Sequence, residues 1–419
     1  MLYRIVVILF FLSAELVSAD FFSYYGDFAR SLYQDKEYIY ESIVKQNGWD
    51  RVFDLYIKLY DLRLQKAVDQ ENLSDEIYDL IEDISDEDIK GLSNYEKDFL
   101  TASLYGSLAY IKSSDPSFSM FRNVRKSKKM FDQLNKKYKT VDTGFGSALS
   151  EIAIGMYFNG SFWVKSVLGY KGNILKGLKQ LDKIANEGDI TKIEANLFLI
   201  EYFSVILKDH NSSLRYSKNL HEINPLSKYF TYIYARDLYH TGKIIKAYQL
   251  FKDINDDPGE KFYGYQYDAI VYEARCLYIK GSFDDAEEVV KYAAKIHDGY
   301  ILKKLRNEWV PSVRIRQEVV LRPQYLSNLN LSLSADELKR TALVCFDHGF
   351  FRETARILET VKKAGTDIAV LKFTTAVVMQ NWNKAKLIFD ENESDFENDP
   401  DRARLDIMKN IVSNHLELF

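Results

Sequence analysis

The sequence predicts an all-α protein, an α-solenoid of stacked antiparallel helical hairpins. Glycine and proline are scarce, at 19 and 6 of 419 residues, which disfavours sheet-rich sandwiches with their frequent tight turns. The side chains are 47% hydrophobic and 28% charged, as in a globular chain that buries a core. The third observation is an internal repeat with the period of a helical hairpin, and it indicates how the helices pair.

Two stretches carry this repeat and align without gaps at an offset of 39, namely residues 234–250 and 273–289. They share Ala, Arg, Leu, Tyr, Gly and a second Ala in the same order. We expect each to form a helix, a turn at Gly242 or Gly281, and a second helix. Ala247 and Ala286 are small enough to let the two helices approach closely, and glycine can take the positive φ of such a turn.

These hairpins resemble the tetratricopeptide repeat (TPR) family, whose unit has small residues at the helix crossings and a large apolar residue four places after the second alanine. Phe251 and Val290 hold that last position. An upstream unit at 194–225 has the same layout, with Ser213 in the small-residue place and Ser217 where a large apolar residue is expected. The resemblance is good over residues 194–298 and implies a right-handed superhelix with a concave binding face.

Fainter units keep the same order of apolar helix, polar turn and apolar helix. Their small or turn residue and the following apolar residue are Gly177 with Leu181, Gly349 with Leu358, and Ala385 with Phe389. Between them, Pro311 and Pro323 interrupt the pattern, because proline stops a helix. The expected organisation is a signal peptide at 1–19, an N-terminal helical region with a degenerate first repeat at 20–150, core TPR-like repeats at 151–304, an irregular connector at 305–333, and C-terminal TPR-like hairpins at 334–419.

The N-terminus has the pattern of a secretory signal. Arg4 makes the start basic, Ile5–Leu12 is an unbroken apolar run, and Val-Ser-Ala at 17–19 suits signal peptidase, so cleavage is expected before Asp20. An uncleaved anchor is the less favoured alternative, since a helix needs about 20 apolar residues to span a bilayer. We therefore expect an exported protein without a membrane span after cleavage, periplasmic or extracellular, with a peripheral place at the outer membrane as an alternative.

Two further sequence features concern cysteine and charge. Cys276 and Cys345 each lie in an apolar helical stretch, which favours two buried free thiols over a disulfide between them. The net charge of -5 gives no indication of nucleic acid as a partner. Residues 55–96 are strongly acidic and residues 122–139 are basic, a pattern typical of solvated helix faces. The alternative is a docking patch for an acidic partner, which requires the basic side chains to share one exposed side.

The sequence predicts no catalytic residue, no metal site and no cofactor. It lacks the phosphate-binding, dinucleotide-binding and nucleophile-elbow motifs, and no two of its six histidines stand three or four residues apart. A calcium-like run at Asp253–Asp257 fails because Pro258 stands where the loop requires glycine.

One helix face offers the best candidate site. Tyrosines, arginines and a histidine recur at three- and four-residue spacing there, and matching positions occur in the neighbouring units. The candidate groove residues are Tyr202, Tyr229, Tyr232, Arg236, Tyr239, His240, Arg275 and Tyr278. Arginine and tyrosine are enriched at binding hot spots, and the TPR resemblance implies that this face lines the concave groove. In the alternative interpretation, the tyrosines pack between hairpins and the arginines pair with neighbouring carboxylates.

Three functions of different classes follow. The first is a non-catalytic exported scaffold that binds a protein or peptide partner in its groove during cell-envelope assembly or secretion. The second is a glycan-binding helical-repeat protein of the outer membrane or surface, for which the tyrosines would be stacking platforms. The third is an all-helical enzyme acting on polysaccharide, which would need opposed carboxylates. The sequence favours the first, and it leaves the oligomeric state open.

Overall fold

The computed structural model describes most of the chain, and the described part is helical. It covers residues 21, 28, 31–34, 42–63, 70–111, 118–157, 172–257, 264–296, 303, 305–322, 324–329, 331, 333–361 and 365–416. No β-strand occurs in these ranges, so the all-α prediction is confirmed. None of their helices has the length and apolar character that crossing a membrane requires. The predicted signal peptide at 1–19 lies outside the described residues.

The chain forms two compact units, one made of residues 1–202 with 413–419 and the other of residues 203–412. The domain boundaries expected from the sequence stay predictions, because compact packing is a different criterion from repeat pattern. The helices of unit 1 are α2 (Ser42–Gln46), α3 (Trp49–Arg63), α4 (Gln70–Ser85), α5 (Asn94–Ile111), α6 (Phe118–Tyr138), the 3₁₀ turn η3 (Asp142–Gly144), α7 (Phe145–Tyr157), α9 (Ile174–Glu187) and α10 (Lys192–Ile200).

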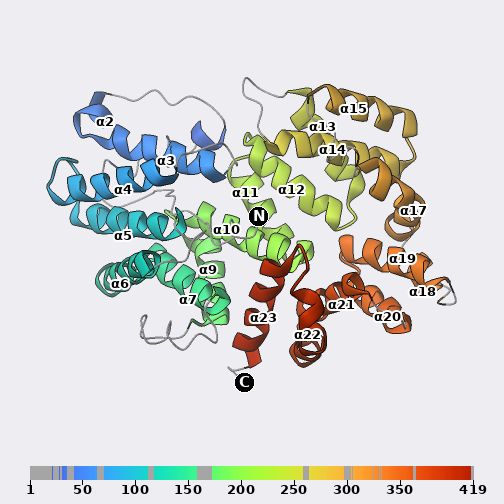
Figure 1. The fold of residues 1–419 in the computed structure, drawn as a ribbon. Coiled ribbons are helices and arrows are strands. Elements are labelled where there is room, and N and C mark those ends of the chain that lie inside the picture. Colours follow the sequence, from blue (N-terminus) through green and yellow to red (C-terminus); the bar gives the residue numbers. More distant parts are fainter. Residues whose placement is uncertain are drawn as a thin grey trace. The chain divides into compact units, whose positions relative to one another are not determined.

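Helices next to one another in sequence pack together in unit 1, with α5 against α6 and α9 against both α7 and α10 (Figure 1). The crossing of α7 and α9 depends on Gly177, as the sequence indicated. A Cβ atom there would lie 2.5 Å from the Ile152 side chain and 2.6 Å from the Ala148 carbonyl oxygen. Only glycine therefore allows the two helices to approach so closely.

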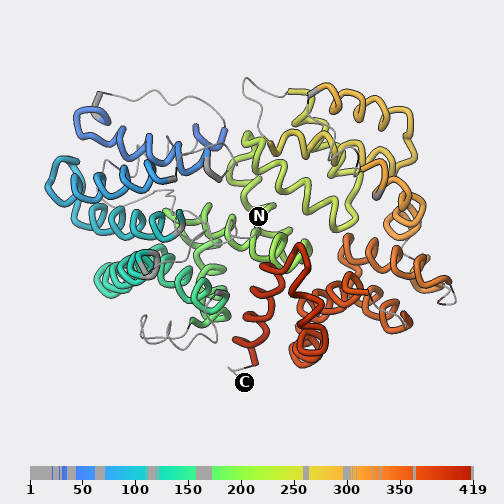
Figure 2. Tube along the Cα trace, viewed as in Figure 1, coloured from blue at the N-terminus to red at the C-terminus, as the bar shows by residue number. Residues whose placement is uncertain are grey.

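The division between the two units falls within the π-helical turn η4 (Glu201–Leu207), and unit 2 continues from there. Its helices are α11 (His210–Ile223), α12 (Lys228–His240), α13 (Ile244–Asp256), α14 (Gly264–Lys280), α15 (Phe283–Ile296), η5 (Leu305–Trp309), η6 (Val310–Ser312), α17 (Val313–Leu321), α18 (Gln324–Ser327), α19 (Ala335–Asp347), α20 (Phe351–Thr360), α21 (Thr366–Val378), α22 (Trp382–Phe396) and α23 (Arg402–Leu416). The tube in Figure 2 shows α12 to α15 and α19 to α22 running back and forth as hairpins.

Four hairpins of unit 2 share one turn. Its central residue has positive φ, donates its backbone N–H to the carbonyl oxygen three residues before it, and is followed by an N–H that reaches five residues back. The central residues are Gly242 (φ 76°), Gly281 (φ 86°), Gly349 (φ 78°) and Gln380 (φ 57°). A buried small residue follows five places later and a buried apolar residue after it, in the pairs Ala247 with Phe251, Ala286 with Val290, Thr354 with Leu358, and Ala385 with Phe389.

This common geometry confirms the predicted α-solenoid of stacked antiparallel hairpins. The segments around Ala235 and Ala274 lie in α12 and α14, which contact each other as the first helices of neighbouring hairpins. Both cysteines are buried and free, since Cys276 lies in α14 and Cys345 in α19.

The segment 305–333, expected to be irregular, contains η5, η6, α17 and α18. Pro311 lies in the first turn of η6, directly after η5, where a helix has no use for the missing N–H, so helical turns continue on both sides of it. Helix α17 packs against both α14 and α19 and so continues the row of first helices.

Candidate functional site

The polar groups of unit 2 gather where the C-terminal end of α12 meets the C-terminal end of α19. The Nδ1 atom of His240 lies 2.8 Å from the Asp347 carbonyl oxygen, and Nδ1 of His348 lies 3.2 Å from the Tyr239 carbonyl oxygen. A third histidine, His210 at the start of α11, stacks on His240 with ring centroids 3.9 Å apart. We call His210, His240 and His348 the histidine cluster.

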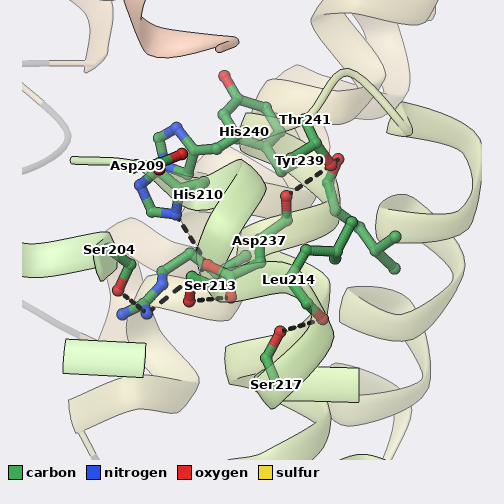
Figure 3. A network of polar contacts seen from close by, with 12 residues as sticks. Ser204, Asp209, His210, Ser213, Leu214, Ser217, Asp237, Tyr239, His240 and Thr241 are labelled. Atoms are coloured by element: carbon green, nitrogen blue, oxygen red, sulfur yellow. Dashed lines mark hydrogen bonds and ion pairs between the residues drawn. The ribbon is translucent and has the colours of Figure 1, made fainter. Parts of the chain in front are cut away.

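A carboxylate lies inside the core of the repeat beside this cluster. Asp237 is fully buried, and at an offset of 39 it corresponds to Cys276 of the next hairpin. It accepts hydrogen bonds from His210 Nδ1 at 2.8 Å and from the Ser213 hydroxyl at 2.6 Å (Figure 3). Burial raises the pKa of Asp237 to about 6, although Arg236 acts to lower it. Ser213 stands in the small-residue place of its unit, so a polar pair replaces the apolar contact at this crossing.

The partners of two histidines fix neutral tautomers. A carbonyl oxygen can only accept, so Nδ1 of His240 and of His348 must carry the proton. Nε2 of His240 then accepts from the Tyr272 hydroxyl at 3.0 Å, and Nε2 of His348 faces Arg316 Nη1 at 3.4 Å. Burial lowers both pKa values, and Arg316 lowers that of His348 further, to about 4.

Three arginines come from successive first helices: Arg236 from α12, Arg275 from α14 and Arg316 from α17. We call them the arginine ladder. Arg275 lies over the rings of Tyr272 and Trp309, with its guanidinium carbon 5.0 Å and 5.7 Å from the ring centroids. Arg316 lies over the same Trp309 ring at 4.9 Å. The aromatic rings therefore separate and support the guanidinium groups, in a typical cation–π arrangement.

The three arginines differ in their partners. Arg316 donates to Asp347 Oδ2 at 2.9 Å, and Arg236 donates to the Ser204 hydroxyl at 2.8 Å with Asp237 Oδ1 at 3.9 Å. Arg275 has neither a hydrogen bond nor a carboxylate partner within the described ranges, and its Nε atom is buried.

Positive charge is in excess around the ladder. Lys208, in the left-handed turn before α11 at φ 60°, has no hydrogen-bond partner in the described part of the chain. Burial, together with Arg404 and Arg236, lowers the pKa of Lys208 to about 8. Asp237, Asp347 and Asp401 are the carboxylates near these cations, and Asp401 pairs with Arg404. Arg275 and Lys208 have no carboxylate ion pair among the described residues.

The structure places most of the predicted tyrosines inside the protein. Tyr232 donates to Asp268 at 3.3 Å, Tyr239 packs against Tyr272, and Tyr278 packs on Trp309 and bonds to Glu287. All three have buried side chains, whereas Tyr229 is half-buried against Tyr265. Tyr202 is buried and belongs to unit 1.

The structure thus brings together part of the predicted set. Arg236, Tyr239, His240 and Arg275 meet around Tyr272, whereas Tyr278 packs on Trp309 and bonds to Glu287. The sequence reasoning missed two residues on the same helices, Asp237 of α12 and Tyr272 of α14. It also missed the residues supplied by other parts of the chain, which are His210, Trp309, Arg316, Asp347 and His348. Tyr272 stands three residues before Arg275 and could have been found by helical spacing; Arg316 and His348 carry no such signal.

In the described ranges no group of three or more His, Cys, Asp or Glu side chains is placed to hold a metal ion. Comparisons with protein-family models, with curated proteins and with solved structures found no match. The proposed function therefore rests on the contacts of unit 2.

Proposed function

We propose that the chain is a non-catalytic, exported helical-repeat scaffold that binds a protein or peptide partner against the arginine ladder of unit 2. The proposal includes the TPR-like character of the hairpins and a place in the cell envelope, in assembly or secretion. It retains Arg236, His240 and Arg275 as residues that contact the partner. The buried tyrosines support these side chains from within.

The observation that carries the proposal is the state of Arg275. The guanidinium of Arg275 lies over two aromatic rings, and its Nε–H is buried without an acceptor. Leaving this donor unsatisfied is unfavourable, and a partner that offers carbonyl or carboxylate oxygens would remove that penalty and would also bind the remaining N–H groups of the guanidinium. A polypeptide offers both kinds of oxygen along its whole length.

Arg275 is also suited to a test, because replacing it leaves no hydrogen-bond partner within the protein unsatisfied. We expect Arg275→Ala to weaken partner binding about tenfold or more while the helical circular dichroism stays unchanged. The partner is captured from envelope extract on immobilised protein, identified by mass spectrometry, and then titrated against both proteins.

Lys280→Ala is the matched control. Lys280 lies on the same helix and also covers an aromatic ring, at 4.0 Å from the centroid of Tyr248, but it is outside the ladder. The Lys280→Ala variant should bind the partner as the wild type does. Equal affinity of wild type and Arg275→Ala would contradict the proposal. Specific binding on a glycan array would favour the glycan-binding function, and turnover of a polysaccharide would favour the enzyme.

A further inference from the structure

Helix α6 in unit 1 presents a basic face to solvent. Its exposed basic residues stand at intervals of one, three, four and seven, which places them on one side of the helix. They are Arg122, Arg125, Lys126, Lys129, Lys136 and Lys137, and we call them the α6 basic face. Arg122 and Lys137 are about 22 Å apart along the axis, at about 1.5 Å per residue.

Several of these charges have no counterion. Arg122, Lys129 and Lys136 have neither an ion pair nor a hydrogen bond from their side chains in the ranges that the structure describes. The single carboxylate of the helix, Asp132, is already held by Lys128 and by the Ser147 hydroxyl. The face is therefore free to attract an anionic partner.

The opposite side of α6 is fixed to the core. Phe131 packs edge-on against Phe99 of α5 with ring centroids 5.3 Å apart, and the Ser127 hydroxyl donates to the Ala102 carbonyl oxygen at 2.8 Å. The backbone under the basic face is thus already ordered, so a partner has only side chains to organise.

An acidic helix, α4, reaches α6 at one point beside this face. Asn123 of α6 donates to the Tyr78 hydroxyl of α4 at 3.3 Å. Asp75 and Glu82 are exposed, and they stand three residues before and four residues after Tyr78, on the same side of α4. A partner that extends from α6 across Tyr78 would meet these carboxylates.

We infer that the α6 basic face docks an acidic polypeptide segment. A single chain rich in Asp and Glu is narrow enough to follow the face without touching α4, whereas a bilayer or a nucleic-acid duplex is broad. Extended at about 3.3 Å per residue, such a segment needs about seven residues to cover it. No described side chain of α6 is a large exposed apolar group that could insert into a membrane. This interaction goes beyond the proposed function and uses no residue of the arginine ladder, so the two can fail separately.

The test uses a fluorescein-labelled oligoglutamate of about 15 residues, the length that also spans the face as a helix. Binding to the full chain is followed by fluorescence anisotropy. We expect Lys129→Glu with Lys136→Glu to weaken binding about tenfold, because two attractions become two repulsions. Binding by the wild type should also weaken steeply as salt is added, since the charges are exposed.

The control is Lys291→Glu with Lys295→Glu on α15. These lysines are also exposed and have no ion pair in the described ranges. Lys295 stands in the last turn of α15, as Lys136 does in α6. The control changes the net charge equally and should bind as the wild type does. Equal loss in both double variants would overturn the inference, as would absence of binding. Tighter binding to anionic phosphatidylglycerol vesicles or to duplex DNA, with the same dependence on Lys129 and Lys136, would also overturn it in favour of that surface.

Discussion

At the scale of single residues, the unusual feature is a carboxylate in the core of a helical repeat. The carboxylate of Asp237 accepts hydrogen bonds from His210 and Ser213, and the guanidinium group of Arg236 lies nearby. A buried carboxylate is tolerated only with such partners, since removing one leaves an uncompensated charge. The network therefore fixes how α11 meets α12 more narrowly than an apolar contact would.

The histidine cluster predicts acid sensitivity of the fold. Burial lowers the pKa values of His210, His240 and His348 below the ordinary 6.5, so below that pH the unfolded chain binds protons that the folded chain does not. The free energy of unfolding should then fall as the pH drops from about 6.5 to about 4. Asp237 acts in the opposite direction between 3.8 and about 6, but one carboxylate opposes three imidazoles.

His348→Gln tests this assignment. A glutamine can donate to the Tyr239 carbonyl oxygen and accept from Arg316, but it does not titrate. The urea midpoint of the wild type should fall between pH 7 and pH 5, and it should fall less in the variant. A variant that loses as much stability as the wild type would show that His348 is not one of the titrating groups.

At the scale of elements, the left-handed turn decides where each hairpin bends. Three hairpins have glycine at its centre, and the fourth has Gln380 at φ 57°. A side chain in this conformation is strained by roughly 1 kcal/mol, because its Cβ approaches the following carbonyl oxygen. The α21–α22 hairpin is stable all the same, since Phe389 and Phe396 pack with Phe373 in its core.

Exchanging residues at this turn should change stability in opposite directions. We expect Gln380→Gly to raise the free energy of unfolding by about 0.5 kcal/mol and Gly281→Ala to lower it by about 1 kcal/mol. The site of Gly281 is open, with its nearest heavy atom 4.0 Å from an added Cβ, so only the backbone contributes. Urea unfolding measures both changes. Gln249→Gly, within α13, should lower stability by about 1 kcal/mol, and a gain there would contradict the conformational explanation.

At the scale of the whole molecule, the chain passes from unit 1 to unit 2 after Tyr202 and returns after Val412. The last turns of α23 therefore belong to the unit that the N-terminal half builds. Asn414 accounts for this return: its side-chain oxygen accepts from the Ile174 N–H at 3.2 Å, and its amide donates to the Gly172 carbonyl oxygen at 2.9 Å.

Removing these two bonds should destabilise unit 1. Asn414→Ala leaves two buried backbone groups of the α9 start without their partner, which costs about 1–3 kcal/mol. Hydrogen exchange should show lost protection of the Ile174 amide, while the amides of α13 in unit 2 stay protected. The half-buried Lys409, five residues earlier on the same helix, forms an ion pair with Glu393 near the surface. Lys409→Ala is the control and should leave both sets unchanged. Equal protection of Ile174 in both variants would contradict the role given to Asn414.

The repeat could be predicted from the sequence, because it depends on interactions between residues that are close together in the chain. Gly242 and Gly281 mark turns that demand positive φ, and Ala247 and Ala286 mark crossings where a larger side chain would not fit. The segment 305–333 was predicted to be irregular, but it has helical turns on both sides of Pro311, because proline is tolerated in the first turn of a helix. The presence of a proline alone does not show whether the helical path ends there or continues.

The residues of the candidate site could be predicted only in part from the sequence. Arg236 and Arg275 follow from the repeat, since equivalent residues of stacked hairpins lie on equivalent faces. Their neighbours Arg316 and His348 come from helices tens of residues later, and no periodicity relates them to α12 or α14. The burial of Tyr239 and Tyr278 also depends on those later helices.

The sequence by itself determined the helical hairpins, their turns and the residues at their crossings, because backbone sterics and side-chain size act between neighbours in the chain. Only the tertiary structure decided which charges meet. It set His210 of the histidine cluster against Asp237 and left the Nε–H of Arg275 without an acceptor, and it joined the acidic helix α4 to the basic helix α6 through the Asn123–Tyr78 hydrogen bond. Electrostatic interactions depend on distance in space and on burial, and both are fixed only when helices distant in sequence pack together.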